Sequence, residues 1–208
     1  MSWKSADGTG EVEPLVDEPT RQYPQSFLPD GSALVFEDQN SGNDLAMLSL
    51  EGERTATLLL HTEFAERNAT LSPDGRWMAY QSDESGQVEV YVRPFPDVDA
   101  RRLPVSNDGG KWPLWAPDGR ELFYFGAQAV MSVAIETEPT FALGTRERLF
   151  DTAPYVTDLG NRRAAIHPDG QRFLVLKELE GSDDTLGPQS VILVLNWFEE
   201  LKRLVPTN

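Results

Sequence analysis

The chain has 208 residues, and its 34 acidic side chains outnumber its 18 basic ones to give a formal net charge of −16. Such a negative field repels phosphate backbones and argues against a general nucleic-acid binder. There is no cysteine, which excludes disulfides, thiol catalysis and cysteine-ligated zinc. The longest apolar runs fall far short of a membrane span, so we expect no direct membrane insertion. No signal peptide opens the chain, which leaves the compartment open: cytoplasmic as written, or extracytoplasmic within a membrane-anchored parent.

The first predicted elements lie in residues 1–22. Trp3-Lys4 is followed by an Asp-Gly-Thr-Gly turn at residues 7–10 and by a second strand-like segment at 11–16. This pattern predicts two antiparallel strands joined by a turn. We interpret them as the outer strands of a preceding structural unit.

A Pro-Asp-Gly triplet then occurs four times, beginning at Pro29, Pro73, Pro117 and Pro168. The spacings are 44, 44 and 51 residues. A bulky apolar residue stands two positions before each proline, and a short β-forming run follows each triplet. Each triplet predicts a hairpin, because Pro presets φ, Asp bonds to nearby backbone and Gly takes positive φ without strain. Four hairpins at near-constant spacing indicate a structural repeat.

Each repeat continues into a third strand, and the first three repeats add a more polar fourth strand. The third strands are expected at 45–50, 88–93, 129–135 and 191–195, and the fourth at 55–60, 101–105 and 146–150. Alternating polarity in 88–93 predicts a strand with one solvated face. The polar fourth strands suit an exposed sheet edge. Residues 196–204 alone have helical spacing of apolar residues.

Four antiparallel strands in every 40–45 residues or so are the pattern of a β-propeller blade. The predicted fold is therefore all-β: a β-propeller of four-stranded antiparallel blades, with about five blades or partial blades and a short C-terminal helix. The boundaries are a partial blade at 1–22, blades at 23–66, 67–110 and 111–161, and an incomplete last blade at 162–208. Two arrangements follow. Either segment 12–16 pairs with the last blade and closes a small ring, or the chain is an open fragment. An open fragment could pair into a homodimer through its blade edges.

The stretches Leu71 to Tyr80 and Trp115 to Tyr124 resemble TolB-type, WD40-like (PD40) propeller repeats. Residues 83–96 and the ending at 195–201 are similar to the propeller region C-terminal to the kinase domain of many bacterial serine/threonine kinases. The resemblance covers nearly the whole chain and implies the sensory or interaction region of a bacterial signalling protein. The chain contains none of the kinase motifs, namely the Gly-rich phosphate loop, His-Arg-Asp and Asp-Phe-Gly, so kinase activity is not implied.

Sequence motifs for catalysis are missing. There is no Gly-x-Ser-x-Gly elbow and no His-Glu-x-x-His, so serine hydrolase and zinc protease chemistry lack their key parts. His61 and His167, the two histidines, occupy different parts of their repeats. Acidic clusters at 82–85 and 106–109 lack the spacing of an EF-hand loop. We therefore predict no metal, no cofactor and no catalytic residue.

One repeated position suggests a binding site. The residues six positions before the four repeated prolines are Tyr23, Arg67, Lys111 and Arg162. The innermost strand of each blade begins here, so blade symmetry predicts that these residues surround one mouth of the channel. Trp112 and Arg163 follow two of them. Three of the four are cations, which predicts a site for an anionic group or an acidic peptide end. The alternative is that they are loop residues paired with nearby acids such as Glu63 or Glu66.

The predicted function is non-catalytic: a scaffold or sensor propeller that recognises a protein, a peptide or a small ligand through its blade loops and channel mouth. Two alternatives remain, because propellers host many functions. One is an accessory propeller like that of prolyl-oligopeptidase-type peptidases. The other is a propeller hydrolase or lyase that uses two channel carboxylates.

Overall fold

The computed structural model describes residues 1–16, 20–39, 42–137, 140–153, 155, 162 and 164–176. They form sixteen β-strands and, within these ranges, no helix. No described segment is a helix long and apolar enough to cross a membrane. The predicted strand at 191–195 and helix at 196–204 lie outside the described residues, as does Arg163. The chain divides into two units, one of Met1 with residues 15–178 and one of residues 2–14 with 179–208.

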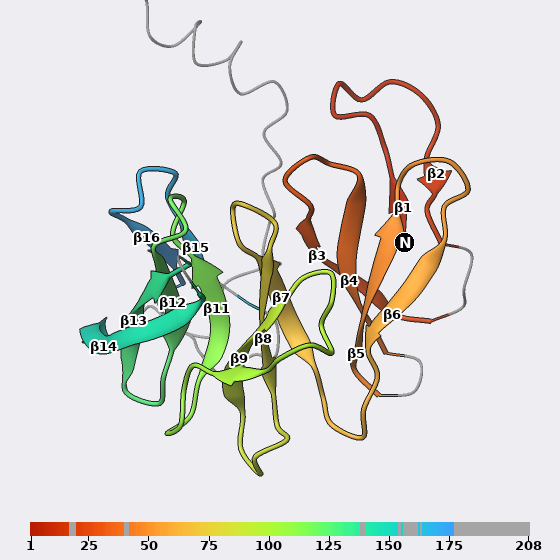
Figure 1. Cartoon of the computed structure of the whole chain (residues 1–208). Coiled ribbons are helices and arrows are strands. Elements are labelled where there is room, and N and C mark those ends of the chain that lie inside the picture. Colours follow the sequence, from red (N-terminus) through yellow and green to blue (C-terminus); the bar gives the residue numbers. More distant parts are fainter. Residues whose placement is uncertain are drawn as a thin grey trace, which may run out of the picture. The chain divides into compact units, whose positions relative to one another are not determined.

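The larger unit contains three four-stranded antiparallel sheets and a hairpin, each in sequential strand order (Figure 1). The first sheet consists of β3 (Gln22–Phe27), β4 (Ala33–Asp38), β5 (Asp44–Ser49) and β6 (Ala56–Leu60). The second consists of β7 (Arg67–Leu71), β8 (Trp77–Ser82), β9 (Glu89–Pro94) and β10 (Leu103–Pro104). The third consists of β11 (Lys111–Trp115), β12 (Glu121–Phe125), β13 (Ala129–Glu136) and β14 (Ala142–Asp151). The hairpin is β15 (Ala164–Ile166) with β16 (Phe173–Val175).

In the smaller unit, β1 (Ser2–Trp3) pairs with β2 (Glu13–Pro14). The all-β prediction and its four-stranded antiparallel repeats are confirmed. The fourth strands differ in length from the expectation: β10 has only two residues, whereas β14 has ten. Pro104 ends β10 because proline has no N–H to donate to a neighbouring strand.

The prediction that the β9 strand has a solvated face is wrong. Its polar residue Glu89 is only 2% exposed, and the apolar residues of both faces are buried. Tyr91 packs into the core between the first and second sheets, while Val90 and Val92 pack into the core between the second and third. The alternation therefore reflects two different neighbours rather than one core and one solvent face.

The core lies between successive sheets. One cluster joins Val35 and Leu45 of the first sheet to Met78 and Tyr80 of the second, and all four side chains are buried. A second cluster joins the second sheet to the third in the same way. Burial of apolar area contributes about 25 cal/mol per Å², so these inter-sheet contacts supply the main stabilisation of the unit.

The Pro-Asp-Gly turns contact one another from repeat to repeat. Gly75 has φ +70°, and a Cβ added there would lie 3.1 Å from Pro29 Cδ of the preceding turn. Gly119 faces Pro73 at 3.6 Å, and Gly170 faces Pro117 at 3.5 Å, in the same way. Each glycine thus provides positive φ and also the space for the proline of the preceding repeat.

This contact predicts a difference between two glycines with the same backbone conformation. Gly31 has φ +75°, but apart from its own chain neighbours no atom of the described residues lies within 4 Å of a Cβ added there. Gly31→Ala should lower the free energy of unfolding by about 1–2 kcal/mol through the positive φ alone. Gly75→Ala should lower it by a further ~1 kcal/mol or more because the new methyl group meets Pro29. Urea unfolding measures both, and equal losses would contradict the turn contact.

Candidate functional site

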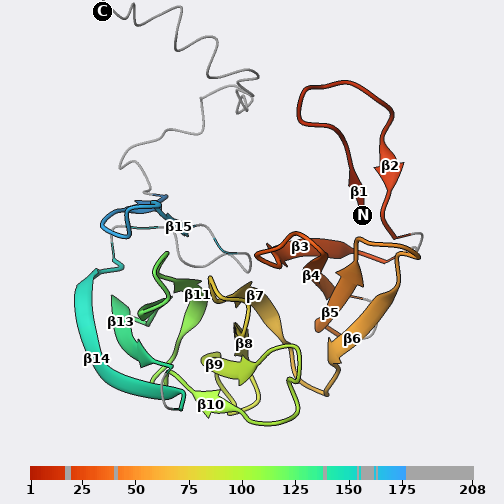
Figure 2. The ribbon, with the colours of Figure 1, turned by 45° about the horizontal axis from the view of Figure 1, so that its top comes forward.

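The first strands of successive sheets lie side by side. β3 packs against β7, β7 against β11, and β11 against β15. Figure 2 shows β3, β7 and β11 following one another, with β6, β10 and β14 at the far side of their sheets. The starts of these inner strands therefore come together, as the sequence predicted for a propeller.

The inner strands β7 and β11 are bulged just after the predicted rim position. One extra residue interrupts the pairing of β7 with β8 after Arg67, and that of β11 with β12 after Lys111. The next residues, Asn68 and Trp112, have positive φ values of 53° and 55°. A bulky side chain such as that of Trp112 rarely adopts this conformation, and the backbone strain costs of order 1–3 kcal/mol. Strained bulges of this kind re-aim side chains next to functional sites.

The rim residues occupy equivalent places in their sheets. Tyr23 pairs with Glu37, Arg67 with Gln81, and Lys111 with Phe125. Arg162 stands just before β15. Their surroundings differ, however, and the four side chains are not equally available to a ligand.

Arg67 faces a buried acid across the boundary between the first and second sheets. Its Nε lies 3.9 Å from Glu37 Oε1, and its side chain is 34% exposed. Glu37 is 1% exposed, and Gln39 Nε2 donates a hydrogen bond to its Oε1 at 3.0 Å. Within the described part of the chain, the second carboxylate oxygen, Oε2, has no hydrogen-bond partner. Desolvation by burial raises the pKa of Glu37.

Lys111 is placed by its neighbour Trp112. The Lys111 ammonium lies 5.0 Å from the centre of the Trp112 ring, which is within cation–π range. Trp112 itself is 1% exposed and packs edge-on against Phe125, with ring centres 5.4 Å apart. Its backbone N–H donates to Gln81 Oε1 at 3.1 Å. Trp112 therefore positions Lys111 in this structure and does not itself present a surface to a ligand.

Arg162 ties the last hairpin to the two preceding inner strands. Its backbone N–H donates to Asn68 Oδ1 at 2.9 Å, and its guanidinium Nη1 donates to the Pro113 carbonyl at 3.2 Å. Desolvation lowers the pKa of this guanidinium. Among the described residues it has no carboxylate partner, so its charge is balanced only by neutral acceptors.

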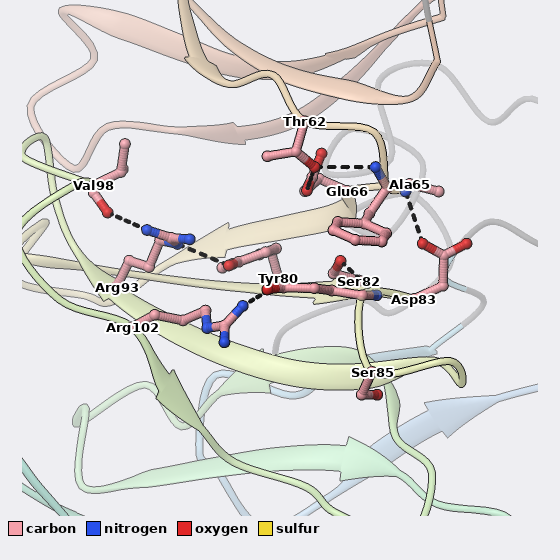
Figure 3. Close-up of polar contacts among 12 residues, drawn as sticks. Thr62, Ala65, Glu66, Tyr80, Ser82, Asp83, Ser85, Arg93, Val98 and Arg102 are labelled. Carbon is pink, nitrogen blue, oxygen red and sulfur yellow. Dashed lines mark hydrogen bonds and ion pairs between the residues drawn. The ribbon is translucent and has the colours of Figure 1, made fainter.

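The loop between β6 and β7 carries further acids near the rim (Figure 3). Thr62 Oγ donates to Glu66 Oε1 at 2.6 Å, and the Ala65 N–H donates to Asp83 Oδ1 at 2.9 Å. Burial raises the pKa of Glu66. The expected pairing of rim cations with Glu63 or Glu66 is replaced, at Arg67, by the ion pair with Glu37.

Sequence reasoning missed Glu37 and Gln81. They are 44 residues apart, and each faces the inner strand of the next sheet. The period of 44 residues could have identified them, because each is a polar residue at the same repeat position in an otherwise largely apolar strand.

Two acids of the Pro-Asp-Gly turns line one of the cavities. Asp74 and Asp118 line a cavity of about 350 Å³ at the Pro-Asp-Gly end. Each accepts a hydrogen bond from the backbone of its own turn, from Arg76 and Arg120 respectively. Contacts with Ser72 and Arg76 lower the pKa of Asp74, which suits an ionised turn residue and not a proton donor. Within the described ranges, no group of three or more His, Asp or Glu side chains could hold a metal ion.

Comparison with known proteins supports a TolB-like β-propeller fold. No family model matches the chain. The solved structure of TolB from Acinetobacter baumannii aligns with a TM-score of 0.58 at 16% identity, covering 85% of this chain and 42% of that one. A TolB structure from Agrobacterium tumefaciens aligns with a TM-score of 0.55 at 20% identity, covering 68% and 53%. At these identities the likeness concerns the fold alone.

One curated relative matches a shorter segment. It is an uncharacterized peptidase, YuxL, of Bacillus subtilis strain 168, and is 35% identical over 63 residues. The match covers 30% of this chain and 10% of the relative. The chain therefore spans only part of each of these proteins.

The buried carboxylate at the rim predicts a pH-dependent effect on stability. Because the folded-state pKa of Glu37 is raised above its ordinary 4.5, its stabilising contribution is present below pH 4.5 and lost as pH rises through the raised value. Glu37→Gln should therefore raise the free energy of unfolding at pH 7 by roughly 1 kcal/mol. The loss of charge near Arg67 costs little, because that side chain is partly hydrated.

Urea unfolding at several pH values tests this expectation, with the exposed Glu51→Gln as the control. The gain from Glu37→Gln should shrink as the pH falls from the raised pKa of Glu37 towards 4.5, and it should be absent below pH 4.5. A difference between wild type and variant that does not change with pH would contradict the assignment.

Proposed function

We propose that this chain is a non-catalytic binding propeller, whose protein, peptide or small-molecule ligand contacts the blade loops and the mouth where the inner strands begin. The observation that carries the proposal is the recurrence of a cation at the starts of three inner elements, at Arg67, Lys111 and Arg162. Arg162 donates hydrogen bonds to Asn68, which follows Arg67, and to Pro113, two residues after Lys111, in a chain whose net charge is −16. An anionic group is the ligand chemistry that this mouth favours.

The desolvated Arg162 adds to the electrostatic argument. A guanidinium that is half-buried and bonded to a carbonyl retains its full charge while losing hydration. An anion brought to such a site interacts more strongly than one at an exposed cation, because screening by solvent is weaker. Lys111, held over the Trp112 ring, and the partly exposed Arg67 extend the positive region across the two preceding strands.

A second candidate is an accessory propeller of a peptidase, which the sequence match to YuxL favours. In that case the catalytic domain would belong to the same polypeptide or to a neighbouring reading frame. Sequencing the gene around this chain tests the two candidates. A catalytic α/β domain in the same or a neighbouring reading frame would support the accessory propeller of a peptidase. A kinase domain would support the interaction region of a signalling protein.

The mouth proposal predicts that removing two rim cations weakens the binding of an acidic peptide. The probe is fluorescein-labelled hexaglutamate, with hexaglutamine as the uncharged comparison. Arg67→Ala combined with Lys111→Ala should weaken binding about tenfold or more, since each charge-assisted contact contributes about 1.5–3 kcal/mol. Fluorescence anisotropy measures the affinity, which should also fall as salt rises.

The matched control combines Arg76→Ala with Arg120→Ala. These arginines follow the Pro-Asp-Gly triplets at the opposite end of the second and third sheets, and their removal changes the net charge by the same amount. Hexaglutamate binding should survive this change apart from a small long-range effect. If the rim variant binds as wild type does, or both double variants lose equally, the mouth is not the site.

A further inference from the structure

A second site is suggested by a cavity of about 520 Å³ between the second and third sheets. One wall is the loop 107–109, which leads from β10 into β11, and another is the turn 126–128 between β12 and β13. The side chains of Asp108, Tyr124, Arg146 and Arg148 line it. We call it the second junction, and the corresponding place between the first and second sheets the first junction.

The two junctions differ in how they are filled. At the first junction, the turn 83–88 has six residues and meets the loop after β6 through the Ala65–Asp83 hydrogen bond (Figure 3). At the second junction, the turn has only three residues, Gly126, Ala127 and Gln128. The facing loop is also built of small residues, with glycine at 109 and 110. The second junction is open because its turn is three residues shorter and its facing loop carries smaller side chains.

An arginine occurs at the same repeat position in both junctions. Arg102 and Arg146 are 44 residues apart and belong to the outer segments of the second and third sheets. At the first junction Arg102 forms an ion pair with Glu84 of the turn. At the second junction Arg146 Nε donates to the Val105 carbonyl at 2.7 Å, and its Nη1 donates to Asn107 Oδ1 at 3.1 Å.

Both partners of Arg146 are neutral. The described residues provide no ion pair to its guanidinium, and the turn 126–128 contains no acid to replace Glu84. The neighbouring Arg148 is instead paired with Asp151. Arg146 is thus oriented by two hydrogen bonds while its charge remains uncompensated at the cavity.

A tyrosine shows the same contrast between the junctions. Tyr80 and Tyr124 are 44 residues apart. The Tyr80 hydroxyl accepts a hydrogen bond from Arg93 Nε at 2.8 Å (Figure 3). Tyr124 is 4% exposed and lines the cavity, yet its hydroxyl has no hydrogen bond to any described residue. Burial raises the pKa of Tyr124, so the hydroxyl remains a proton donor at neutral pH.

We infer that the second junction binds a carboxylate group, with Arg146 as its charge partner and the Tyr124 hydroxyl as a hydrogen-bond donor. The ligand carboxylate takes the role that Glu84 has at the first junction. A free organic acid and the acidic side chain of a peptide share this chemistry. The inference goes beyond the proposed function, because it concerns a different cavity and does not require the rim cations.

The charges around the cavity favour one carboxylate over a phosphate or a metal ion. Asp108 lines the cavity, and the buried Glu89 binds the Gly109 N–H at 3.0 Å behind the loop. These acids repel a dianion, whereas the positive charge of Arg146 repels a cation. A single carboxylate group, which carries one negative charge and only accepts hydrogen bonds, fits the Arg–Tyr pair best.

Calorimetric titration tests the site with N-acetyl-glutamate α-amide, and with N-acetyl-glutamine α-amide as the neutral isostere. Wild type should bind the glutamate probe at least about tenfold more tightly than the glutamine probe. Arg146→Gln should abolish that preference, whereas the matched control Arg102→Gln should leave it within about twofold. Tyr124→Phe keeps the ring and should weaken binding a few-fold.

A second set of variants works through the cavity itself. Gln128→Glu supplies an internal carboxylate, which should pair with Arg146, raise the unfolding temperature and reduce probe binding about tenfold. Asp108→Asn removes a repelling charge and should tighten binding a few-fold. These variants keep the inference falsifiable should Arg146→Gln unfold, which circular dichroism would reveal.

Two further arms complete the experiment. Butyrate and the peptide acetyl-Ala-Glu-Ala-amide compare a free acid that has one carboxylate with a peptide side chain. The tighter binder of the two identifies the source of the carboxylate. The rim variant Arg67→Ala/Lys111→Ala should bind the glutamate probe as wild type does. A failure of the mouth proposal can then be distinguished from a failure of the inference about the second junction. Equal binding of the two N-acetyl probes by wild type, or unchanged binding by both Arg146→Gln and Gln128→Glu, would overturn the inference.

Discussion

The arrangement of this protein depends on sheets that are apolar on both faces. Alternate residues of β8 and β9 enter different cores: Met78 and Tyr80 face the first sheet, while Ala79 and Val90 face the third. A sheet of this kind cannot remain in water on either side, so it requires a neighbour on each. Sheet-on-sheet packing then places the inner strands next to one another. The rim is a geometric result of this burial, and its charges lie at the starts of the inner strands.

Much of the fold could be predicted from the period of 44 residues, because turn chemistry and strand runs are local properties of the chain. The same period predicts where inner strands begin, and β7 and β11 do begin at Arg67 and Lys111. What a strand packs against is not local. This explains the wrong prediction for β9: its alternation resembled that of a half-solvated strand, although Glu89 is buried and both faces are covered. The same limit applies to Trp112, which the sequence placed beside the mouth and the structure places in the core. Positive φ at a tryptophan has no sequence signature at all.

The repeats also act as internal controls for function. Where equivalent positions both link one sheet to the next inner strand, the residue serves the fold. Glu37 does so through the Arg67 side chain, and Gln81 does so through the Trp112 N–H. Where an equivalent position loses its partner, the residue is available for something else. Arg146 and Tyr124 satisfy this second condition, and both lie at one cavity. Comparing blades within one chain thus separates structural polar groups from binding groups without any other sequence.

The contact between each glycine and the preceding proline has a consequence for how such a protein can diversify. The Pro-Asp-Gly turns contain five, five, five and six residues, since each turn must fit against its neighbour. The other three connections at that end, 50–55, 95–102 and 137–141, contain six, eight and five residues. The turns at the opposite end of the three sheets contain five, six and three. The Pro-Asp-Gly turns are therefore nearly constant in length, whereas the turns at the opposite end vary. A change of length in the variable turns leaves every glycine–proline contact in place, so these turns can change without disturbing the contacts that link one repeat to the next.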